Sequence, residues 1–229
     1  MTDLEITRPL RRFVESLGRN ADESLGGRVR ATLALEPRVA RTGEFELAPG
    51  LEAILTRRGI GALFSHQADA LARVRAGRDV LISTATASGK SLIYNLTIAE
   101  RALARRDARA LLLFPLKALE HDQRMSLRAD FAALPLLDGP TAEIYDGDTS
   151  PYQRKRIREQ PPTALFTTPD MLHFGILPGH EGWKEFLRNL ELVVVDEVHT
   201  YRGVLGAHFA QIMRRLLRVA QHHGANPQI

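Results

Sequence analysis

The stretch Ser83-Thr-Ala-Thr-Ala-Ser-Gly-Lys-Ser91 lies between a short apolar run at 79–82 and a long apolar segment with helical periodicity. A strand, a loop of small residues and the first turn of a helix bring several backbone N–H groups toward one point, and such a point binds phosphate. Lys90 is then placed to reach the outer phosphates of a nucleotide, and the Ser91 hydroxyl to hold Mg²⁺. The general phosphate-loop pattern has glycine where this chain has Thr84. The alternative is an ordinary turn that caps a helix.

On both sides of this loop, short apolar runs alternate with longer amphipathic segments. Strands are predicted at 79–82, 110–114, 142–145, 163–167 and 191–195, and helices near 66–75, 90–104, 117–130 and 150–159. A last helix is predicted from an apolar face made of Leu205, Phe209, Ile212, Met213, Leu216 and Ala220. This alternation predicts an α/β fold, doubly wound, in which helices cover both faces of a mainly parallel sheet.

The segment before this pattern differs in character. Residues 1–59 are predicted to form a helical amino-terminal extension, because apolar residues recur at helical spacing before the breakers Gly26, Gly27 and Pro37. The α/β pattern runs through residues 60–229, so these residues are predicted to form one domain.

Composition limits the class of protein. The 229 residues suffice for one domain and a short extension, and 44% hydrophobic residues exclude a wholly disordered chain. The net charge of +4 permits an anionic partner without demonstrating one. The absence of cysteine excludes a disulfide framework and any thiolate metal site. No apolar run approaches the roughly 18 residues of a membrane helix, so we expect a cytoplasmic protein without membrane contact.

Two carboxylates follow the last predicted strand. In an open parallel sheet, ligands bind beyond the carboxyl ends of the strands, so Asp196 and Glu197 are expected at the same edge as the loop. Asp196 can bind the Mg²⁺ that Ser91 also holds. Glu197 can orient and deprotonate the water that attacks the γ-phosphate. The alternative is that both are loop residues or helix caps.

Together, the loop and the acidic pair resemble the motifs of superfamily 2 DExH-box helicases. The stretches that narrow the resemblance are Thr-Ala-Thr-Ala-Ser-Gly-Lys-Ser-Leu-Ile-Tyr-Asn (84–95), Tyr-Asp-Gly-Asp-Thr (145–149), Thr-Pro-Asp-Met-Leu-His (168–173) and Val-Asp-Glu-Val-His-Thr-Tyr-Arg-Gly-Val-Leu-Gly-Ala-His (195–208). They resemble the DNA helicase group typified by mitomycin repair factor A, the MrfA/YprA type. The resemblance covers about residues 60 to 229 and implies the first RecA-like, ATP-binding lobe. In this group the residues at 84 and 87 are commonly not glycine.

The resemblance implies roles for particular residues in an ATP site. Lys90 and Glu197 are the implied catalytic residues, and Ser91 and Asp196 the implied Mg²⁺ ligands. Gln67 resembles the glutamine that reads the adenine edge, for which an amide has both a donor and an acceptor; its alternative is a solvated residue that opens a helix. The implied ATP-binding set is Gln67, Thr84, Thr86, Ala87, Ser88, Gly89, Lys90 and Ser91.

Contacts with nucleic acid are implied at two further motifs. Lys117 lies in a stretch that resembles motif Ia and Thr168 in one that resembles motif Ib, and in relatives both motifs touch the backbone of the tracked strand. For each, the alternative is a solvated loop residue or a helix cap. His199 is implied to couple the nucleotide site to the motif that follows.

Two other clusters suggest less. The basic run Arg154, Lys155, Arg156 and Arg158 is interpreted as a solvated helix face. His222 and His223 are neighbours that cannot readily chelate one ion from a helix, and no third ligand is spaced nearby, so no zinc is assigned.

The resemblance implies the ATP-binding lobe of an ATP-dependent DNA helicase that serves DNA repair, with ATP and Mg²⁺ as cofactors and single-stranded or tailed DNA as partner. The second RecA-like lobe is missing, and 224–229 looks like the start of a next strand. We therefore expect a fragment that binds Mg-ATP weakly and turns it over negligibly on its own. Alternatives are an RNA helicase lobe, a nucleotide or nucleic-acid binding module without turnover, and a disfavoured P-loop kinase.

Overall fold

The computed structural model describes residues 41–84, 88–136 and 139–229. The chain divides into two compact units, Met1–Ala40 and Arg41–Ile229, and the described residues all belong to the second. The helix predicted from the periodicity before Gly26 lies outside the described residues. The second unit begins at Arg41, which is earlier than the boundary at residue 60 predicted from the sequence.

Four parallel strands form the sheet that the described residues contain, and their order is β2-β3-β1-β4. Leu112 of the central β1 lies beside Phe166 of β3 on one side and Val194 of β4 on the other. The bounds are Arg109–Leu113 for β1, Ala142–Ile144 for β2, Ala164–Thr167 for β3 and Leu190–Val195 for β4. Four of the five predicted strands are thus confirmed to within a residue or two, together with the α/β class.

The fifth prediction, a strand at 79–82, was wrong: this segment is extended but forms no ladder. The Val80 N–H donates to the Ile229 carbonyl at 3.0 Å, and the Ile229 N–H donates to Asp79 Oδ1 at 2.9 Å. Gln228 in turn pairs with Leu192 of β4. A strand needs a run of paired neighbours, and the two hydrogen bonds with Ile229 do not make such a run.

The long helices follow the predictions closely. Their bounds are Ser65–Arg75 (α3), Lys90–Ala104 (α4), Lys117–Ala132 (α5), Pro151–Glu159 (α6) and Gly203–His222 (α9), and the shorter α2 spans Glu52–Arg58. Between β3 and β4 the chain forms short helical turns that the sequence did not predict: α7 (Pro169–Met171), η1 (Leu172–Ile176), η2 (Leu177–Trp183) and α8 (Lys184–Leu187). Pro178 and the non-helical Gly179 interrupt the periodicity there. No helix of the described part combines the length and apolarity needed to cross a membrane.

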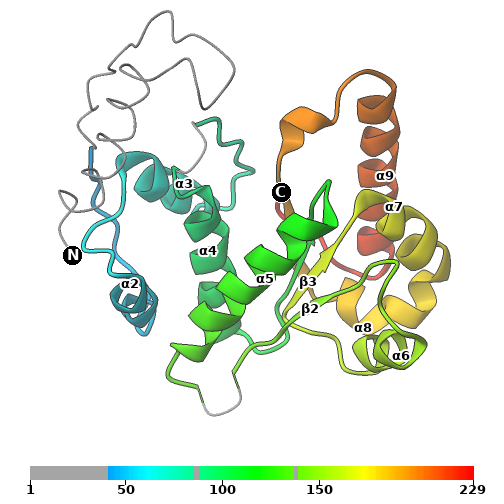
Figure 1. Ribbon diagram of the computed structural model, residues 1–229, viewed down its shortest axis with the longest axis horizontal. Helices are drawn as coiled ribbons and strands as arrows, with labels where there is room; N and C mark the ends of the chain where they lie inside the picture. Colours follow the sequence, from blue (N-terminus) through cyan, green and yellow to red (C-terminus); the bar gives the residue numbers. More distant parts are fainter. Residues whose placement is uncertain (1–40, 85–87, 137–138) are drawn as a thin grey trace, which may run out of the picture. The chain divides into compact units, whose positions relative to one another are not determined.

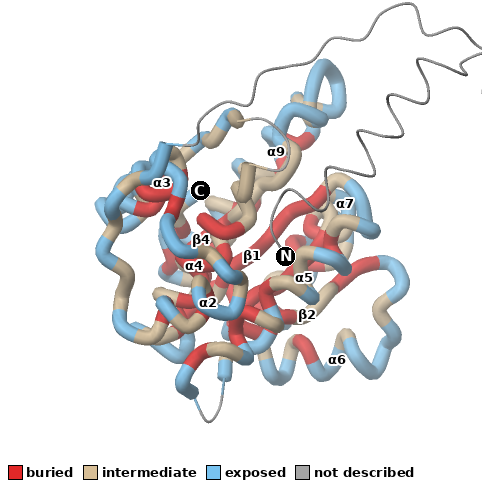
Figure 2. The backbone as a smooth tube through the Cα atoms, turned by 60° about the vertical axis from the view of Figure 1, so that its left-hand side comes forward, coloured by how far each residue is buried: buried red, intermediate tan, exposed pale blue. Residues whose placement is uncertain are grey.

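Helices cover both faces of the sheet, and two hydrophobic cores result (Figure 1). Side chains alternate along β1, so Leu112 joins a core with α3, α4 and α5, whereas Leu111 and Leu113 join a core with α6, α8 and α9. The tube in Figure 2 shows the strands as the buried centre between exposed helix faces. Helix α2 also belongs to the first core, in which Leu51 and Ile54 are fully buried.

The predicted apolar face of α9 is buried over most of its length. Phe209, Ile212, Leu216 and Ala220 are buried, but Leu205 is 55% exposed. A helix of 20 residues spans about 30 Å, whereas a strand of 6 residues, such as β4, spans about 20 Å. The first turn of α9 therefore extends past the sheet that its middle covers.

A buried carboxylate fastens α2 to α5. Asp130 is fully buried and accepts hydrogen bonds from Arg57, Arg58 and Asn95, with the Arg58 Nε bond at 2.8 Å and the Asn95 bond also at 2.8 Å. Burying a carboxylate is costly unless donors replace water. Here three side chains from α2 and α4 do so, and α2 is held to the domain by charge as well as by apolar packing.

Replacing Asp130 by alanine is expected to lower the free energy of unfolding by about 3 kcal/mol, at the low end for a buried pair because Arg57 and Arg58 still reach water. That loss corresponds to a fall in Tm of roughly 6–12 °C for a chain of this size. Asp122→Ala, an exposed position on the same helix, should change stability by less than about 0.5 kcal/mol. Equal unfolding midpoints for the two variants in a urea titration would show that the Asp130 network contributes nothing.

Candidate nucleotide site

The phosphate loop leads directly into α4. Gly89 precedes the helix with a φ of 75°, and Lys90 and Ser91 form its first turn. The Lys90 Nζ donates to the Thr84 carbonyl at 3.2 Å, and the hydroxyls of Thr84 and Ser88 lie 2.6 Å apart. Thr84 therefore contacts both Ser88 and Lys90, and the lysine lies at the positive end of a helix of 15 residues. Thr86 and Ala87 lie outside the described residues.

Gln67 is buried against this loop rather than solvated. Its Oε1 accepts from the Phe64 N–H at 2.9 Å, and its Nε2 donates to the Gly89 carbonyl at 3.0 Å. A Cβ on Gly89 would lie 2.6 Å from the Gln67 Nε2, so a side chain there would displace the Gln67 amide, and the positive φ of Gly89 itself favours glycine. The amide keeps one further donor and one further acceptor position for a base edge.

His66 is a neighbour of the loop that the sequence did not single out. Its Nε2 lies 3.1 Å from the Ser88 carbonyl, so two successive side chains of α3 contact the phosphate loop. The only sequence signal was its place beside Gln67 in the stretch that resembles the adenine-reading motif.

The acidic pair, Asp196 and Glu197, follows the end of β4, and the charge of Lys90 acts on Asp196. The Asp196 N–H donates to the Leu113 carbonyl of β1 at 3.0 Å, and Asp196 Oδ1 accepts from the Glu197 N–H at 2.8 Å. Burial raises the pKa of Asp196, the hydrogen bond from the Glu197 N–H lowers it, the charge of Glu197 raises it, and the charge of Lys90 lowers it. The charge of Lys90 thus contributes to the electrostatic environment of Asp196, although the two residues are more than a hundred residues apart in sequence.

Glu197 has an unusual backbone. Its φ of 48° makes it the one non-glycine residue with positive φ among the described residues, a conformation that costs of order 1–3 kcal/mol. The Thr200 N–H donates to the Glu197 carbonyl at 2.9 Å and helps to hold this turn. One carboxylate oxygen of Glu197 lies 3.1 Å from the Nδ1 of His199. The turn therefore brings together the implied base and the implied coupling residue.

The two candidate nucleic-acid contacts lie at the same edge of the sheet. Lys117 begins α5, after β1, and Thr168 precedes α7, after β3. The Thr168 hydroxyl accepts from the Met171 N–H at 3.2 Å, so it does cap a short helix, while its own hydrogen remains able to donate. The Lys117 Nζ donates to Asp148 at 2.8 Å, and this bond raises the pKa of Lys117.

The basic run on α6 is used mainly within the protein. Arg154 donates to the carbonyls of Thr149 and Asp146 at 2.8 Å each and lies over the ring of Tyr145. Arg156 pairs with Glu143 at 3.1 Å. Arg154 therefore holds the loop at 145–149 in shape, and Asp148 of that loop faces Lys117.

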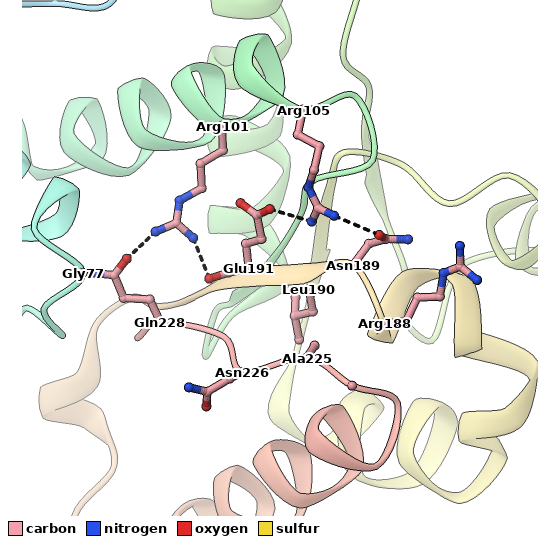
Figure 3. A pocket seen from close by; sticks show the side chains of 11 residues that line it. Gly77, Arg101, Arg105, Arg188, Asn189, Leu190, Glu191, Ala225, Asn226 and Gln228 are labelled. Atoms are coloured by element: carbon pink, nitrogen blue, oxygen red, sulfur yellow. Dashed lines mark hydrogen bonds and ion pairs between the residues drawn. The ribbon is translucent and has the colours of Figure 1, made fainter.

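A hollow at the opposite edge of the sheet is not a nucleotide site (Figure 3). Its arginines already have partners: Arg105 pairs with Glu191, and Arg101 donates to the Glu191 carbonyl and to Gln228. Ligands of open parallel sheets bind at the carboxyl ends of the strands, whereas Glu191 lies at the start of β4.

The fold and these motifs define a RecA-like helicase lobe. The family model described as DEAD/DEAH box helicase matches residues 64–227, and the chain belongs to this family.

Individual relatives refine the comparison. The chain is 43% identical over 175 residues to the ATP-dependent helicase HRQ1 of Saccharomyces cerevisiae. The matched stretch covers 76% of this chain and 16% of that protein. It is 40% identical over 199 residues to the uncharacterized ATP-dependent helicase YprA of Bacillus subtilis, covering 84% and 26% of the two chains. The chain thus spans about a quarter or less of the length of these relatives.

Solved structures agree with the sequence comparison. The DUF1998 helicase MrfA bound to DNA and AMPPNP superposes with a TM-score of 0.81 at 40% identity, over 85% of this chain and 27% of that one. The DEAD-box helicase Mss116, at 14% identity and a TM-score of 0.68, shares the fold. The predicted class of helicase lobe is confirmed.

Proposed function

We propose that this chain is the ATP-binding lobe of an ATP-dependent DNA helicase that acts in DNA repair. The observation that carries the proposal is the position of Lys90, in the first turn of α4 after the loop, together with that of Asp196, directly after β4 at the carboxyl edge of the sheet. The relatives named ATP-dependent helicases support the activity, and MrfA has been crystallised with DNA and a nucleotide analogue. The repair role rests on the resemblance to the mitomycin repair factor group.

The residues present fit a magnesium nucleotide. Ser91 and Asp196 offer a hydroxyl and a carboxylate, the hard oxygen ligands that Mg²⁺ prefers. The first turn of α4 and Lys90 supply the positive potential that phosphates need. In this proposal, a bound Mg²⁺ would supply charge neutralisation at the phosphates, while Gln67 would contact the base and Glu197 would accept a proton from the attacking water.

We propose that the tracked DNA strand crosses Lys117 and Thr168. Adjacent strands β1 and β3 place both residues at the carboxyl edge. The carboxylate of Asp148 forms an ion pair with the ammonium group of Lys117, and a DNA phosphate would compete with Asp148 for that ammonium group. In the native protein, Lys117→Ala is expected to weaken single-stranded DNA binding and to reduce the slope of log Kd against log salt by about one.

A matched control makes this DNA prediction specific. Lys155→Ala removes a lysine on α6 that is 69% exposed and pairs with Glu159 at 3.7 Å. Its salt slope should equal that of the wild type. If Lys117→Ala also leaves the slope unchanged, Lys117 does not contact a phosphate.

The choice between DNA and RNA needs a direct experiment. Backbone contacts alone distinguish the two sugars poorly. The ATPase rate of the native full-length protein should be stimulated by single-stranded DNA and much less by RNA of the same sequence. Stimulation by RNA alone would favour an RNA helicase, and phosphoryl transfer to a small acceptor without nucleic-acid stimulation would favour a P-loop kinase.

A second candidate concerns the 229 residues taken alone. A helicase completes its ATP site with an arginine from a second RecA-like lobe, and this chain matches only a quarter of YprA. We propose that these residues by themselves bind Mg-ATP weakly without appreciable turnover. Robust DNA-stimulated hydrolysis by the isolated chain would contradict this.

A further inference from the structure

Three side chains with metal-binding atoms meet at the carboxyl end of α9. His180 and Glu181 come from η2, and His223 follows α9 directly. One ligand atom from each of the three lies within 4.8 Å of the others. His180 and His223 are 43 residues apart in sequence, so the cluster is a product of the fold. No role in the proposed helicase function uses it.

The distances suit a shared tetrahedral ion. His180 Nδ1 lies 3.0 Å from His223 Nε2 and 3.5 Å from Glu181 Oε1. Ligand atoms bound tetrahedrally to Zn²⁺ at 2.0–2.1 Å are about 3.3 Å apart, which falls between these two separations. The ligand atoms of Glu181 and His223 lie within 4.8 Å of each other, and side-chain movements that bring them closer would place all three atoms on one ion.

The donor types select the metal. Two neutral imidazoles and one carboxylate are a set that Zn²⁺ accepts in proteins, and the fourth position is then open to water. Magnesium and calcium prefer sites made of oxygen atoms. The side chain of His180 is 30% exposed and that of Glu181 is 72% exposed, so an ion can reach the cluster from solvent.

The surroundings show what binding would do. Trp183 and Phe186, which follow His180, are buried in the second core, and so are Leu216 and Ala220 of α9. An ion at the cluster would join η2 to the end of α9 above an already packed core. The cluster lies past the end of a helix of 20 residues whose beginning follows His199, about 30 Å away along the axis.

We propose that His180, Glu181 and His223 form a Zn²⁺ site that fastens η2 to the carboxyl end of α9. The sequence argument against zinc considered residues near His222 and His223 along the chain. The missing ligands are His180 and Glu181, which only the fold brings near. A hydrogen bond between two neutral imidazoles is the rival explanation for the shortest of these distances.

The test uses the native protein without an affinity tag and Zn²⁺ as the probe. Each of His180→Gln, Glu181→Gln and His223→Gln is expected to bind one Zn²⁺ fewer than the wild type, or to bind it at least about tenfold more weakly, in competition with a chromophoric chelator. His208→Ala, an exposed histidine near the start of α9, should bind as the wild type does. Equal zinc binding by the wild type and the three variants would overturn the proposal.

A second measurement guards against variants that merely misfold. Zn²⁺ should raise the Tm of the wild type and of His208→Ala, because an ion that binds the folded state stabilises it. It should not raise the Tm of the three ligand variants, whose far-UV circular dichroism should match the wild type. A Tm that zinc leaves unchanged in the wild type would support the hydrogen-bonded pair and overturn the site.

Discussion

Lys90→Ala is expected to lower the DNA-stimulated ATPase rate of the native protein at least about a hundredfold. The side chain lies at the first turn of α4, against the Thr84 carbonyl and within electrostatic range of Asp196. In the proposed function, its charge faces the point where negative charge develops on the transferred phosphate. Steady-state hydrolysis at saturating DNA measures the effect.

The control for this result is another lysine. Lys155→Ala removes an exposed ammonium group on α6, and its ATPase rate should equal that of the wild type. Both variants should unfold near the wild-type Tm. If Lys90→Ala hydrolyses ATP within threefold of the wild-type rate, the loop at 83–91 does not hold the reacting phosphates, and the proposed function fails with it.

Glu197→Gln is expected to lower kcat by about 10²–10⁴ while the Kd for ATP stays within about threefold of the wild-type value. The amide has nearly the same shape as the carboxylate, so binding persists, but it cannot accept a proton from the attacking water. Nucleotide binding by fluorescence and hydrolysis by phosphate release separate the two effects.

Glu159→Gln is the matched control for this substitution. Glu159 is exposed at the end of α6 and pairs only loosely with Lys155. Its kcat should be unchanged. A Glu197→Gln protein that loses ATP binding in proportion to its rate would assign Glu197 to ground-state binding instead of proton transfer.

The sequence predicted the fold well where local pattern and topology agree. The runs that became β1, β3 and β4 are continuous and apolar because both faces of the sheet are covered, and this pattern is hard to mistake. The same rule of parallel sheets predicts Asp196 and Glu197 at the carboxyl edge, and both residues directly follow β4. The segment at 79–82 shows the limit, because its composition suits a strand but its pairing depends on Gln228 and Ile229.

The site was predictable in its residue types and not in its contacts. Gln67 and Gly89 touch because α3 and α4 pack together, a fact that spacing along the chain cannot contain. The positive φ of Glu197 and the clamp of Arg154 on the loop at 145–149 likewise depend on tertiary structure. The sequence shows only that residues 154–158 are mostly basic, whereas the structure shows which partners the arginines of this run contact and therefore what they do.

The packing of α2 has a practical consequence for dissecting this protein. The family match begins at residue 64. However, Leu51 and Ile54, which precede it, are fully buried in the first core. Arg57 and Arg58 also precede it, and both form ion pairs with the buried Asp130. A recombinant piece trimmed to the family match would expose the apolar surface that α2 covers. It would also leave the buried carboxylate of Asp130 without its two arginine partners. The family match is therefore shorter than the compact unit Arg41–Ile229, and a recombinant piece should begin no later than Arg41.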